Sequence, residues 1–365
     1  MLGNKHALTN EQVLRALATV QEPELHRDLV SLDMIKNLQI EGGRVSFTIM
    51  LTTPACPLRH VMERDVRAAL AQVPGVTEVK VGWDARVTTA GSGASRGALP
   101  MPARNVVAIA SGKGGVGKST VAVNVAVALA QTGARVGLLD ADIYGPNTPM
   151  MLGASYTPVQ SAGKLLPARA HGIELFSMGF MVRSDQPIIW RGPMLDKAIR
   201  QFLTDVAWGD LDYLIVDMPP GTGDAQLVVS QAMAVAGAVI VTLPQAVSQA
   251  DARRGLEGFK QMDVPVLGVV ENMSYLALPD GSRLDVFGQG GGRALAEAAG
   301  VPFIGEIPMD PQVRIGGDAG TPVVISHPDS PAAQAFVAVA RDVAAKISVA
   351  NFLNQNNVIP ITEIN

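Results

Sequence analysis

Glycine, lysine and serine occur at residues 112–119 in a spacing that suits phosphate binding. The segment reads GKGGVGKS, which satisfies the pattern G-x-x-x-x-G-K-[ST]. Glycines let the backbone wrap closely, so several N–H groups point at phosphate oxygens, and the helix expected next adds the positive end of its dipole. Lys118 can reach the β- and γ-phosphates, and the Ser119 hydroxyl can ligate Mg²⁺. The segment therefore predicts binding of ATP with Mg²⁺ through Gly112, Lys113, Gly114, Gly115, Val116, Gly117, Lys118, Ser119 and Thr120.

Acidic residues follow two apolar runs further along the chain. Asp140 and Asp142 come after the run 135–139, and Asp217 ends the run 213–216 in the Walker B pattern. Ligands of open α/β sheets lie outside the carboxyl ends of the strands, where such carboxylates meet the phosphates. We expect Asp217 to join the Mg²⁺ shell and Asp142, with Asp140 as second choice, to orient the attacking water. The alternative for these last two is a pair of solvated loop aspartates. The Pro- and Gly-rich segment 218–224 suits a switch that responds to hydrolysis.

The segments that must position these residues alternate between apolar runs and helical periodicity from residue 105 onward. Runs at 106–110, 135–139, 213–216, 239–243, 266–270 and 303–307 predict buried strands, and helices are expected at 119–131, 225–235, 251–262, 293–299 and 331–347. Continuous apolar strands that alternate with helices indicate a parallel sheet covered on both faces. The predicted fold class is α/β, a P-loop NTPase with a mostly parallel sheet of about seven strands.

A small α+β unit is expected ahead of this sheet. A helix opening at Asn10, a strand at 44–51, a loop at 52–57, a helix at 58–72 and a strand at 76–81 form a compact module. The stretch 86–104 is rich in Gly, Ser, Ala and Pro and predicts a flexible linker. The expected domains are therefore the module at 1–85, the linker at 86–104, the P-loop domain at 105–348 and a tail at 349–365.

Composition excludes several classes of protein. Of the 365 residues 48% are hydrophobic and 17% are charged, and the net charge of −4 provides no broad basic surface for nucleic acid or anionic membranes. The N-terminus lacks the apolar core of a secretory signal, and polar residues interrupt the apolar stretch 225–243, as in a buried helix followed by a buried strand. We expect a cytoplasmic protein with no nucleic-acid or membrane partner. The single cysteine, Cys56, excludes an intrachain disulfide and a four-cysteine metal site.

The segment KGGVGKST at 113–120 resembles the deviant Walker A class, the family of MinD, ParA and nitrogenase iron-protein relatives. That resemblance implies an ATP-dependent homodimer in which Lys113 acts in trans on the partner's nucleotide. The motifs DADIYGPN, WRGPM, DMPPGTGD, ENMSY and FGQGGG follow in the order typical of the Mrp/ApbC/Nbp35 branch, the iron–sulfur cluster carrier ATPases. This resemblance covers about 105–346. It implies that Asn272 contacts adenine and that the segment 307–310, with Pro308, lines the base.

The N-terminal module carries a second resemblance. Its segments DLVSL at 28–32 and TTPACP at 52–57 are similar to the MIP18 (DUF59) domain, which is also tied to iron–sulfur assembly. Together the two resemblances imply an ATP-binding and ATP-hydrolysing iron–sulfur cluster carrier that delivers clusters to apoproteins.

The chain departs from that branch at one motif. Its cluster carriers usually have a C-x-x-C after N-M-S, and here Leu278 and Gly281 stand at those positions. Thiolates are the normal ligands of iron–sulfur clusters, so the usual bridging site is absent. Cys56 is the only remaining thiol, and its place ahead of a helix N-terminus is one where its pKa could be lowered. With His60 or glutathione it is a candidate metal or cluster ligand; the alternative is a partly buried thiol without chemistry and a surface histidine.

Three hypotheses follow from these patterns. The first is the cluster carrier. The second is a positioning ATPase like MinD or ParA, which is disfavoured because the last expected helix carries little basic charge and the chain has no basic surface. The third is a nucleotide-gated dimeric scaffold without its own cluster, which recruits partners through the N-terminal module.

Overall fold

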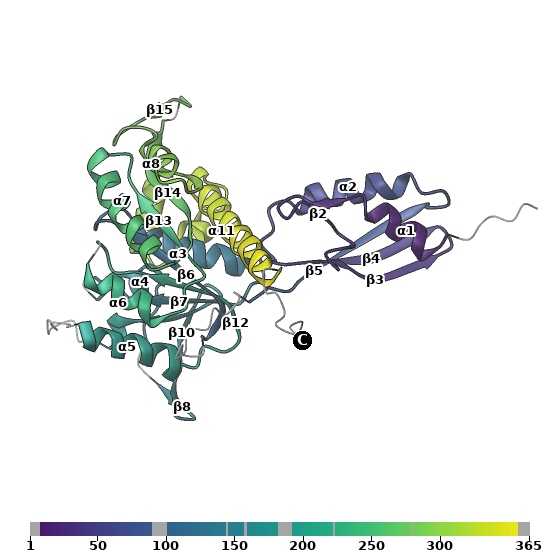
Figure 1. Ribbon diagram of the computed structural model, residues 1–365. Coiled ribbons are helices and arrows are strands. Elements are labelled where there is room, and N and C mark those ends of the chain that lie inside the picture. The colour runs from purple at the N-terminus through teal and green to yellow at the C-terminus, as the bar shows by residue number, and fades with distance from the viewer. Residues whose placement is uncertain are drawn as a thin grey trace, which may run out of the picture. The chain divides into compact units, whose positions relative to one another are not determined.

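The computed structural model describes residues 8–89, 101–143, 145–156, 159–181, 192–221, 223–278 and 280–356. The chain divides into two compact units, of which the smaller comprises 1–88 with 348–365 and the larger comprises 89–347 (Figure 1). Parts of the predicted motifs, namely Tyr144, Trp190, Arg191 and Thr222, lie outside the described residues, as do 90–100 of the predicted linker and 357–365 of the predicted tail. No helix in the described ranges has the length and the apolar character needed to cross a bilayer.

A nine-stranded sheet forms the centre of the larger unit. Its strands lie in the order β10–β11–β7–β12–β6–β13–β14–β15, with β16 paired to β14. Within the described residues seven of the nine strands run parallel, and the short β10 and β15 pair antiparallel to β11 and β14. The predicted mostly parallel sheet is therefore confirmed. The strands are β6 (Ala103–Ser111), β7 (Val136–Asp140), β10 (Ala168–Ala170), β11 (Ile173–Ser177), β12 (Leu211–Asp217), β13 (Gly237–Thr242), β14 (Val266–Ala277), β15 (Arg283–Leu284) and β16 (Phe303–Met309).

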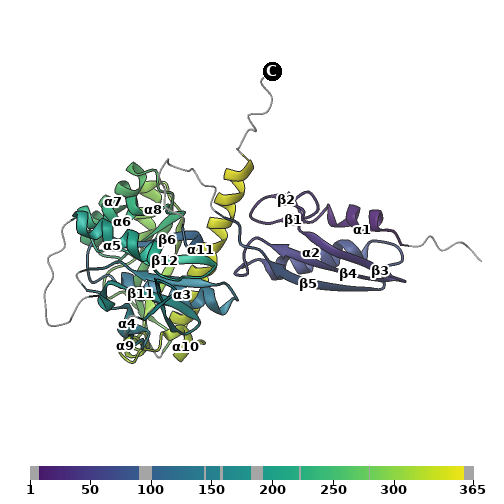
Figure 2. The same ribbon diagram turned by 90° about the horizontal axis from the view of Figure 1, so that it is seen from below.

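Helices cover both faces of this sheet. Helix α3 (Lys118–Gln131) packs against β6, β7 and β12, whereas α7 (Ala246–Gln261) packs against β13, β6 and β14. Figure 2 shows α3 and α11 on one side of the strands and α5 to α8 on the other. The remaining elements of the unit are α4 (Thr148–Met151), the hairpin β8 (Gln160–Ser161) and β9 (Lys164–Leu165), the 3₁₀ turn η1 (Met178–Phe180), α5 (Gly192–Asp205), α6 (Asp224–Ala232), α8 (Gly291–Ala299), α9 (Pro311–Asp318), α10 (Val323–Ser326) and α11 (Pro331–Asn356).

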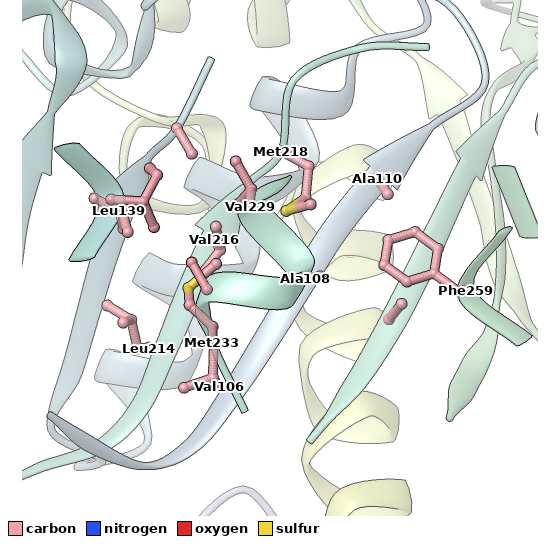
Figure 3. Close-up of a cluster of buried hydrophobic side chains, with 14 of the residues drawn as sticks. Val106, Ala108, Ala110, Leu139, Leu214, Val216, Met218, Val229, Met233 and Phe259 are labelled. Atoms are coloured by element: carbon pink, nitrogen blue, oxygen red, sulfur yellow. The ribbon is translucent and has the colours of Figure 1, made fainter. Parts of the chain in front are cut away.

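The core explains why the central strands are apolar at nearly every position. Side chains alternate along a strand, so Val106, Ala108 and Ala110 of β6 face the α5–α8 layer, where they pack with Val216 and Phe259 (Figure 3). The intervening residues of β6 are buried toward the opposite layer. A sheet buried on both faces needs apolar side chains at both sets of positions, which is the pattern the sequence shows. The result is a rigid platform whose carboxyl ends carry the polar residues of the site.

Several elements were not predicted, and two differences concern the sheet edge and the last helix. Strand β11, which pairs with β7, was not predicted, because its sequence IELFS alternates and is too short to stand out from the loops around it. Helix α11 continues to Asn356 rather than ending at residue 347, and its last turns belong to the smaller unit. Apolar periodicity alone does not reveal this continuation, because the added residues are rich in Asn and Ser.

The smaller unit has its own sheet and core. The three strands β3 (Ile35–Glu41), β4 (Arg44–Leu51) and β5 (Glu78–Ala85) pack with α1 (Asn10–Leu17) and α2 (Arg59–Ala71), and β1 (Gln21–Glu22) pairs with β2 (Arg27–Asp28). Every second residue of β4 is buried, as expected for a strand with one face on a core. The end of α11 joins this unit: Ser348 Oγ donates to Thr52 Oγ1 at 2.6 Å, and Asn351 Nδ2 donates to the Thr88 carbonyl at 3.0 Å.

Candidate functional site

The glycine-rich loop lies between the end of β6 and the start of α3. Gly115 and Gly117 both have a φ of +82°, in the left-handed region that favours glycine. Gly117 is the N-cap of α3, and among the described residues no side chain caps that helix end. The first-turn N–H groups of α3 are thus available to an anion, and the helix dipole adds to the attraction.

Two neighbouring elements fix the path of this loop. The backbone of Asp251 in α7 lies so close to Gly112 that an added Cβ would be 2.0 Å from its carbonyl carbon. On the other side, Asn272 at the end of β14 donates from Nδ2 to the Val116 carbonyl at 2.9 Å, and a Cβ on Gly117 would lie 2.2 Å from the same nitrogen. The loop is therefore clamped between α7 and β14, and glycine is required at both contact points.

Lys118 reaches toward two carboxylates. Its Nζ lies 2.5 Å from Asp217 Oδ1 and 3.7 Å from Asp142 Oδ2, and all three side chains are buried. Burial raises the pKa of Asp217, and the adjacent Lys118 ammonium partly offsets that shift. Two acids share one ammonium here, so the cluster has room for another positive charge.

The donor set fits Mg²⁺. Asp217 Oδ2 is fully buried and, within the part of the chain that the structure describes, has no hydrogen-bond partner. Buried polar atoms are almost always partnered, so such an orphan oxygen indicates a missing ligand. The Ser119 hydroxyl lies on the same side of the cluster, 3.4 Å from Lys118 Nζ. A carboxylate oxygen and a hydroxyl are the oxygen ligands that Mg²⁺ prefers, together with phosphates and water.

The two aspartates after β7 have different surroundings. Sheet register places Asp140 beside Asp217 on one side and Ser177 on the other. Asp140 Oδ2 accepts from the Thr148 hydroxyl at 2.9 Å and the Ser177 hydroxyl at 3.0 Å, and its Oδ1 accepts from the Asp142 N–H at 3.1 Å. Burial, reinforced by the charge of Asp217, raises the pKa of Asp140 to about 7. Asp140 thus holds the loop that carries Asp142, whereas Asp142 faces Lys118.

A pocket of about 430 Å³ lies next to the start of α3. Its lining includes three of the predicted nucleotide contacts, Thr120, Asn272 and Pro308. The rest is largely apolar, with methionines from α4 and from the ends of β14 and β16. Its size and lining suit a flat heterocycle held by a few polar groups. The loop cradle, the buried lysine and this pocket thus bring together every predicted nucleotide residue of the larger unit.

Cys56 and His60 belong to the smaller unit, and they do not form a metal site with other described residues. No group of three or more His, Cys, Asp or Glu side chains suited to a metal occurs in the described ranges. Cys56 is half-buried, and burial raises the pKa of its thiol to about 11, with a smaller contribution from Glu24. The expectation of a lowered pKa is wrong, because desolvation outweighs the backbone N–H groups at the start of α2.

The positions that replace the usual cysteine pair form a turn. Gly281 N–H donates to the Leu278 carbonyl at 2.9 Å, and Leu278 N–H donates to the Ser282 carbonyl at 2.9 Å. Gly281 has a φ of +83°. These bonds close the hairpin between β14 and β15, and neither a leucine nor a glycine side chain carries a thiolate.

Several residues of the site were not predicted. Thr148 and Ser177 support Asp140, and Asp251 supports the loop through its backbone. Thr148 and Ser177 follow no motif spacing, because they approach Asp140 from separate elements. Asn272 was predicted from the family resemblance as a contact to adenine, and the structure adds that its amide donates to the Val116 carbonyl of the loop.

A glycine loop between a buried strand and a helix, a buried lysine and carboxylates at the ends of parallel strands define a P-loop nucleotide-binding protein. Residues 102–344 match the family described as the NUBPL iron-transfer P-loop NTPase, and residues 10–81 match the iron–sulfur cluster assembly protein family. The chain belongs to the NUBPL iron-transfer P-loop NTPase family and carries an assembly-type domain ahead of it.

Full-length relatives carry the same combination. An iron–sulfur cluster carrier protein of Synechocystis is 55% identical over 94% of this chain and 99% of the relative, and one of Deinococcus radiodurans is 52% identical over 96% and 99%. Among solved structures, a nucleotide-binding protein of Archaeoglobus fulgidus in complex with ADP is 40% identical, with a TM-score of 0.54 over 59% of this chain and 86% of that chain. The Pyrococcus furiosus cell division ATPase MinD, 23% identical with a TM-score of 0.50 over 66% of this chain and 98% of that chain, shares the fold.

Proposed function

We propose that this protein is a Mg²⁺-dependent ATPase that carries iron–sulfur clusters and delivers them to apoproteins in the cytoplasm. The observation that carries the proposal is the match to cluster carrier proteins over 94% or more of the chain, and the buried cluster of Lys118, Asp142 and Asp217 beside the glycine loop supports it. The ADP complex of the Archaeoglobus relative supports nucleotide binding in the same kind of fold.

The residues of the site have separable tasks in this proposal. Loop N–H groups and the start of α3 bind the phosphates, and Lys118 moves its ammonium from Asp217 toward the β- and γ-phosphates, where negative charge develops. Ser119 and Asp217 hold Mg²⁺, which supplies further charge neutralisation when bound. Asp142 orients the attacking water, and Asp140 positions Asp142 through its N–H. Asn272 and Pro308 bind the base.

Lys113 is proposed to act across a homodimer. Its side chain is partly exposed, and within the described residues it forms no ion pair, so its charge is available to a second molecule. Its carbonyl accepts from Ser111 Oγ at 2.9 Å, which orients the residue within the loop. If the proposal is right, Lys113→Ala stays monomeric in sedimentation with a non-hydrolysable ATP analogue, whereas the exposed control Lys164→Ala dimerises. ATP-dependent dimers of Lys113→Ala would rule out the role in trans.

A second function is favoured by the turn at Leu278 and Gly281. Because these positions lack thiols and Cys56 is protonated at neutral pH, the chain can also be a nucleotide-gated scaffold that recruits assembly partners without a cluster of its own. The carrier function then requires Cys56, with external ligands, as the cluster site. The two functions differ in whether iron is ever bound.

Two measurements test the proposal. Lys118→Ala is expected to lower ATP turnover about 10²–10³-fold, the usual cost of removing a cation that stabilises transition-state charge, while Lys164→Ala retains it. Unchanged turnover in Lys118→Ala would contradict the ATPase assignment.

The cargo is tested by anaerobic reconstitution with iron and sulfide, followed by visible absorption and iron analysis of wild type and Cys56→Ala. Stoichiometric iron with a charge-transfer spectrum in wild type, lost in the variant, supports a carrier that uses the N-terminal unit. Absence of iron with intact ATP binding supports the scaffold.

A further inference from the structure

A second cavity lies in the larger unit, between α6 and α7. It has a volume of about 390 Å³, within the range of ligand sites, and is separate in its lining from the pocket beside α3. Both helices contribute one face to it: Gly223, Gln226, Leu227 and Gln231 from α6 and its N-cap, and Arg254, Gly255, Gly258, Gln261 and Met262 from α7 and its C-cap. We call this cavity the α6/α7 groove. Gly223 belongs to the predicted switch segment 218–224, and the other lining residues lie outside the predicted nucleotide site.

An unsatisfied polar group, the side chain of Gln226, lines the α6 side of the groove, and Ser230 is buried beside it on the same helix. Gln226 and Ser230 are each 5% exposed and one helical turn apart on the same face of α6. Within the described residues neither Gln226 Nε2 nor Ser230 Oγ has a hydrogen-bond partner. An unpaired buried donor destabilises a fold, and apolar residues would fill these positions at no such cost. Because Gln226 lines the groove, its amide is placed where a bound molecule can complete its hydrogen bonds.

The α7 side of the groove leaves space for a bound molecule to lie directly against the helix backbone. A Cβ at Gly258 would meet nothing within 4 Å, although glycine in the middle of a helix is unfavourable. Exposed Gln231 and Gln261 stand at the groove, and each side-chain amide both donates and accepts. Arg254 adds a guanidinium that is 67% exposed and pairs with Asp251 at 3.3 Å.

Amide donors and acceptors on two walls, with a glycine between them, suit a polypeptide backbone. Peptide groups present alternating C=O and N–H groups, which glutamine amides match, and the missing side chain at Gly258 lets a backbone lie close to α7. Exposed Leu227, at 41%, offers an apolar contact to a side chain of that segment. The guanidinium of Arg254 adds a preference for an acidic residue.

We propose that the α6/α7 groove binds an extended segment of the apoprotein client. This inference rests on the proposed carrier function and adds to it the surface that receives the client. The segment supplies a backbone carbonyl to Gln226 and packs against Gly258.

Binding is measured by fluorescence anisotropy of two labelled probes, a small apo-ferredoxin and the apo form of a [4Fe–4S] dehydratase, with the full chain. Gly258→Leu fills the groove without a backbone clash and is expected to weaken binding at least tenfold. Glu257→Leu, which puts the same side chain on the neighbouring exposed position of α7, is the matched control and is expected to bind like wild type.

Gln226→Leu separates a binding role from a structural one. If Gln226 serves binding, Gln226→Leu is expected to bind the client at least tenfold more weakly. Its Tm is expected to stay the same or rise, because the substitution removes an unpaired buried amide. A lowered Tm together with wild-type binding would mean that Gln226 is structural and would overturn the proposal.

The failure of this inference is distinguishable from failure of the carrier function. Equal client binding by wild type and Gly258→Leu, or no saturable binding of either probe by wild type, overturns the groove assignment. Iron content after reconstitution and ATP turnover are measured on the same samples, and both are expected to be unchanged in Gly258→Leu. If wild type itself binds no iron after reconstitution, the result contradicts the carrier function and does not bear on the groove.

Discussion

Three buried carboxylates lie beside the phosphate loop, and two of them share Lys118. Asp217 contacts Lys118 directly, Asp142 lies 3.7 Å from it, and Asp140 is held by hydroxyl and N–H donors instead. The sequence predicted that these acids would meet the loop, because each follows an apolar strand. It ranked Asp142 ahead of Asp140 for orienting water, but it could not show that Asp140 has hydroxyl partners in α4 and β11. The hydrogen bonds identify Asp140 as a support for the loop.

The raised pKa of Asp140, about 7 against an ordinary 3.8, predicts a pH dependence of stability. Between about pH 4 and 7 the folded state keeps a proton that the unfolded state has lost, so this group lowers the free energy of unfolding as the pH rises. Asp140→Asn removes the titration, and the Tm of the variant is expected to fall less than that of wild type from pH 4 to 7. Thermal unfolding monitored by circular dichroism measures both curves. Parallel curves would show that Asp140 does not titrate in this range.

Cys56 is expected to be a slow nucleophile. A pKa of about 11 instead of 9.0 leaves roughly a hundredfold less thiolate at neutral pH, and alkylation requires the thiolate. Iodoacetamide labelling followed by mass spectrometry reports on this residue alone, because the chain has one cysteine. We expect labelling at pH 7.5 to be about 100-fold slower in the folded protein than in guanidinium, and to accelerate up to about pH 11. Fast labelling of the folded protein at pH 7.5 would contradict the burial of the thiol.

At the level of elements, the phosphate loop depends on α7 and β14 as much as on its own glycines. Gly112 and Gly117 meet neighbouring atoms, whereas Gly114 has nothing within 4 Å of an added Cβ. The sequence motif does not distinguish these glycines, and it does not predict which neighbouring residue each of them contacts. Packing therefore requires glycine at 112 and 117, the left-handed φ of +82° favours it at 115, and neither reason applies to Gly114.

This division gives a matched pair of variants. Gly112→Ala drives a methyl group into the Asp251 backbone, and overpacking of this kind destabilises by about 1–3 kcal/mol. We expect Gly112→Ala to lower the Tm and to lose nucleotide binding, measured by fluorescent ATP-analogue titration. Gly114→Ala adds the same methyl in open space and is expected to keep its Tm. If the two variants behave alike, contact with α7 does not fix the loop.

The strands show where prediction from the sequence succeeds. Strands buried on both faces, such as β6 and β12, appear as unbroken apolar runs and were found within a few residues of their bounds. Strand β3 was missed because one face is exposed and its pairing with β4 is interrupted near Asn37, which has a φ of +53°. A strand buried on both faces gives a continuous apolar run that is easy to recognise in the sequence. A strand with one exposed face gives a weaker pattern.

At the scale of the whole molecule, the smaller unit is built from both ends of the described chain. Asn351 is 3% exposed, and its amide donates to the Thr88 carbonyl; Arg27 lies over the Phe352 ring at 5.6 Å. Ser348 bonds to Thr52, in the loop that carries Cys56. The final turns of α11 are thus part of the packing of this unit.

A chain that stops after Ile347 is expected to have a less stable smaller unit, because Thr52 and Thr88 lose their buried partners. Hydrogen exchange of residues 44–57 and 78–88 measures the effect, and we expect at least tenfold faster exchange there. A chain that stops after Asn356 keeps α11 and serves as the control. Equal protection in both truncated chains would mean that these turns contribute nothing.

This shared construction has a consequence for synthesis on the ribosome. Domains generally fold as they emerge, and the N-terminal one folds first. Here the loop that carries Cys56 forms its hydrogen bond with Ser348 only late, because Ser348 is translated some 300 positions after Thr52. The newly made smaller unit therefore passes through a period in which its polar Thr52 and Thr88 face water, and it reaches its final packing only after the nucleotide-binding unit has been made.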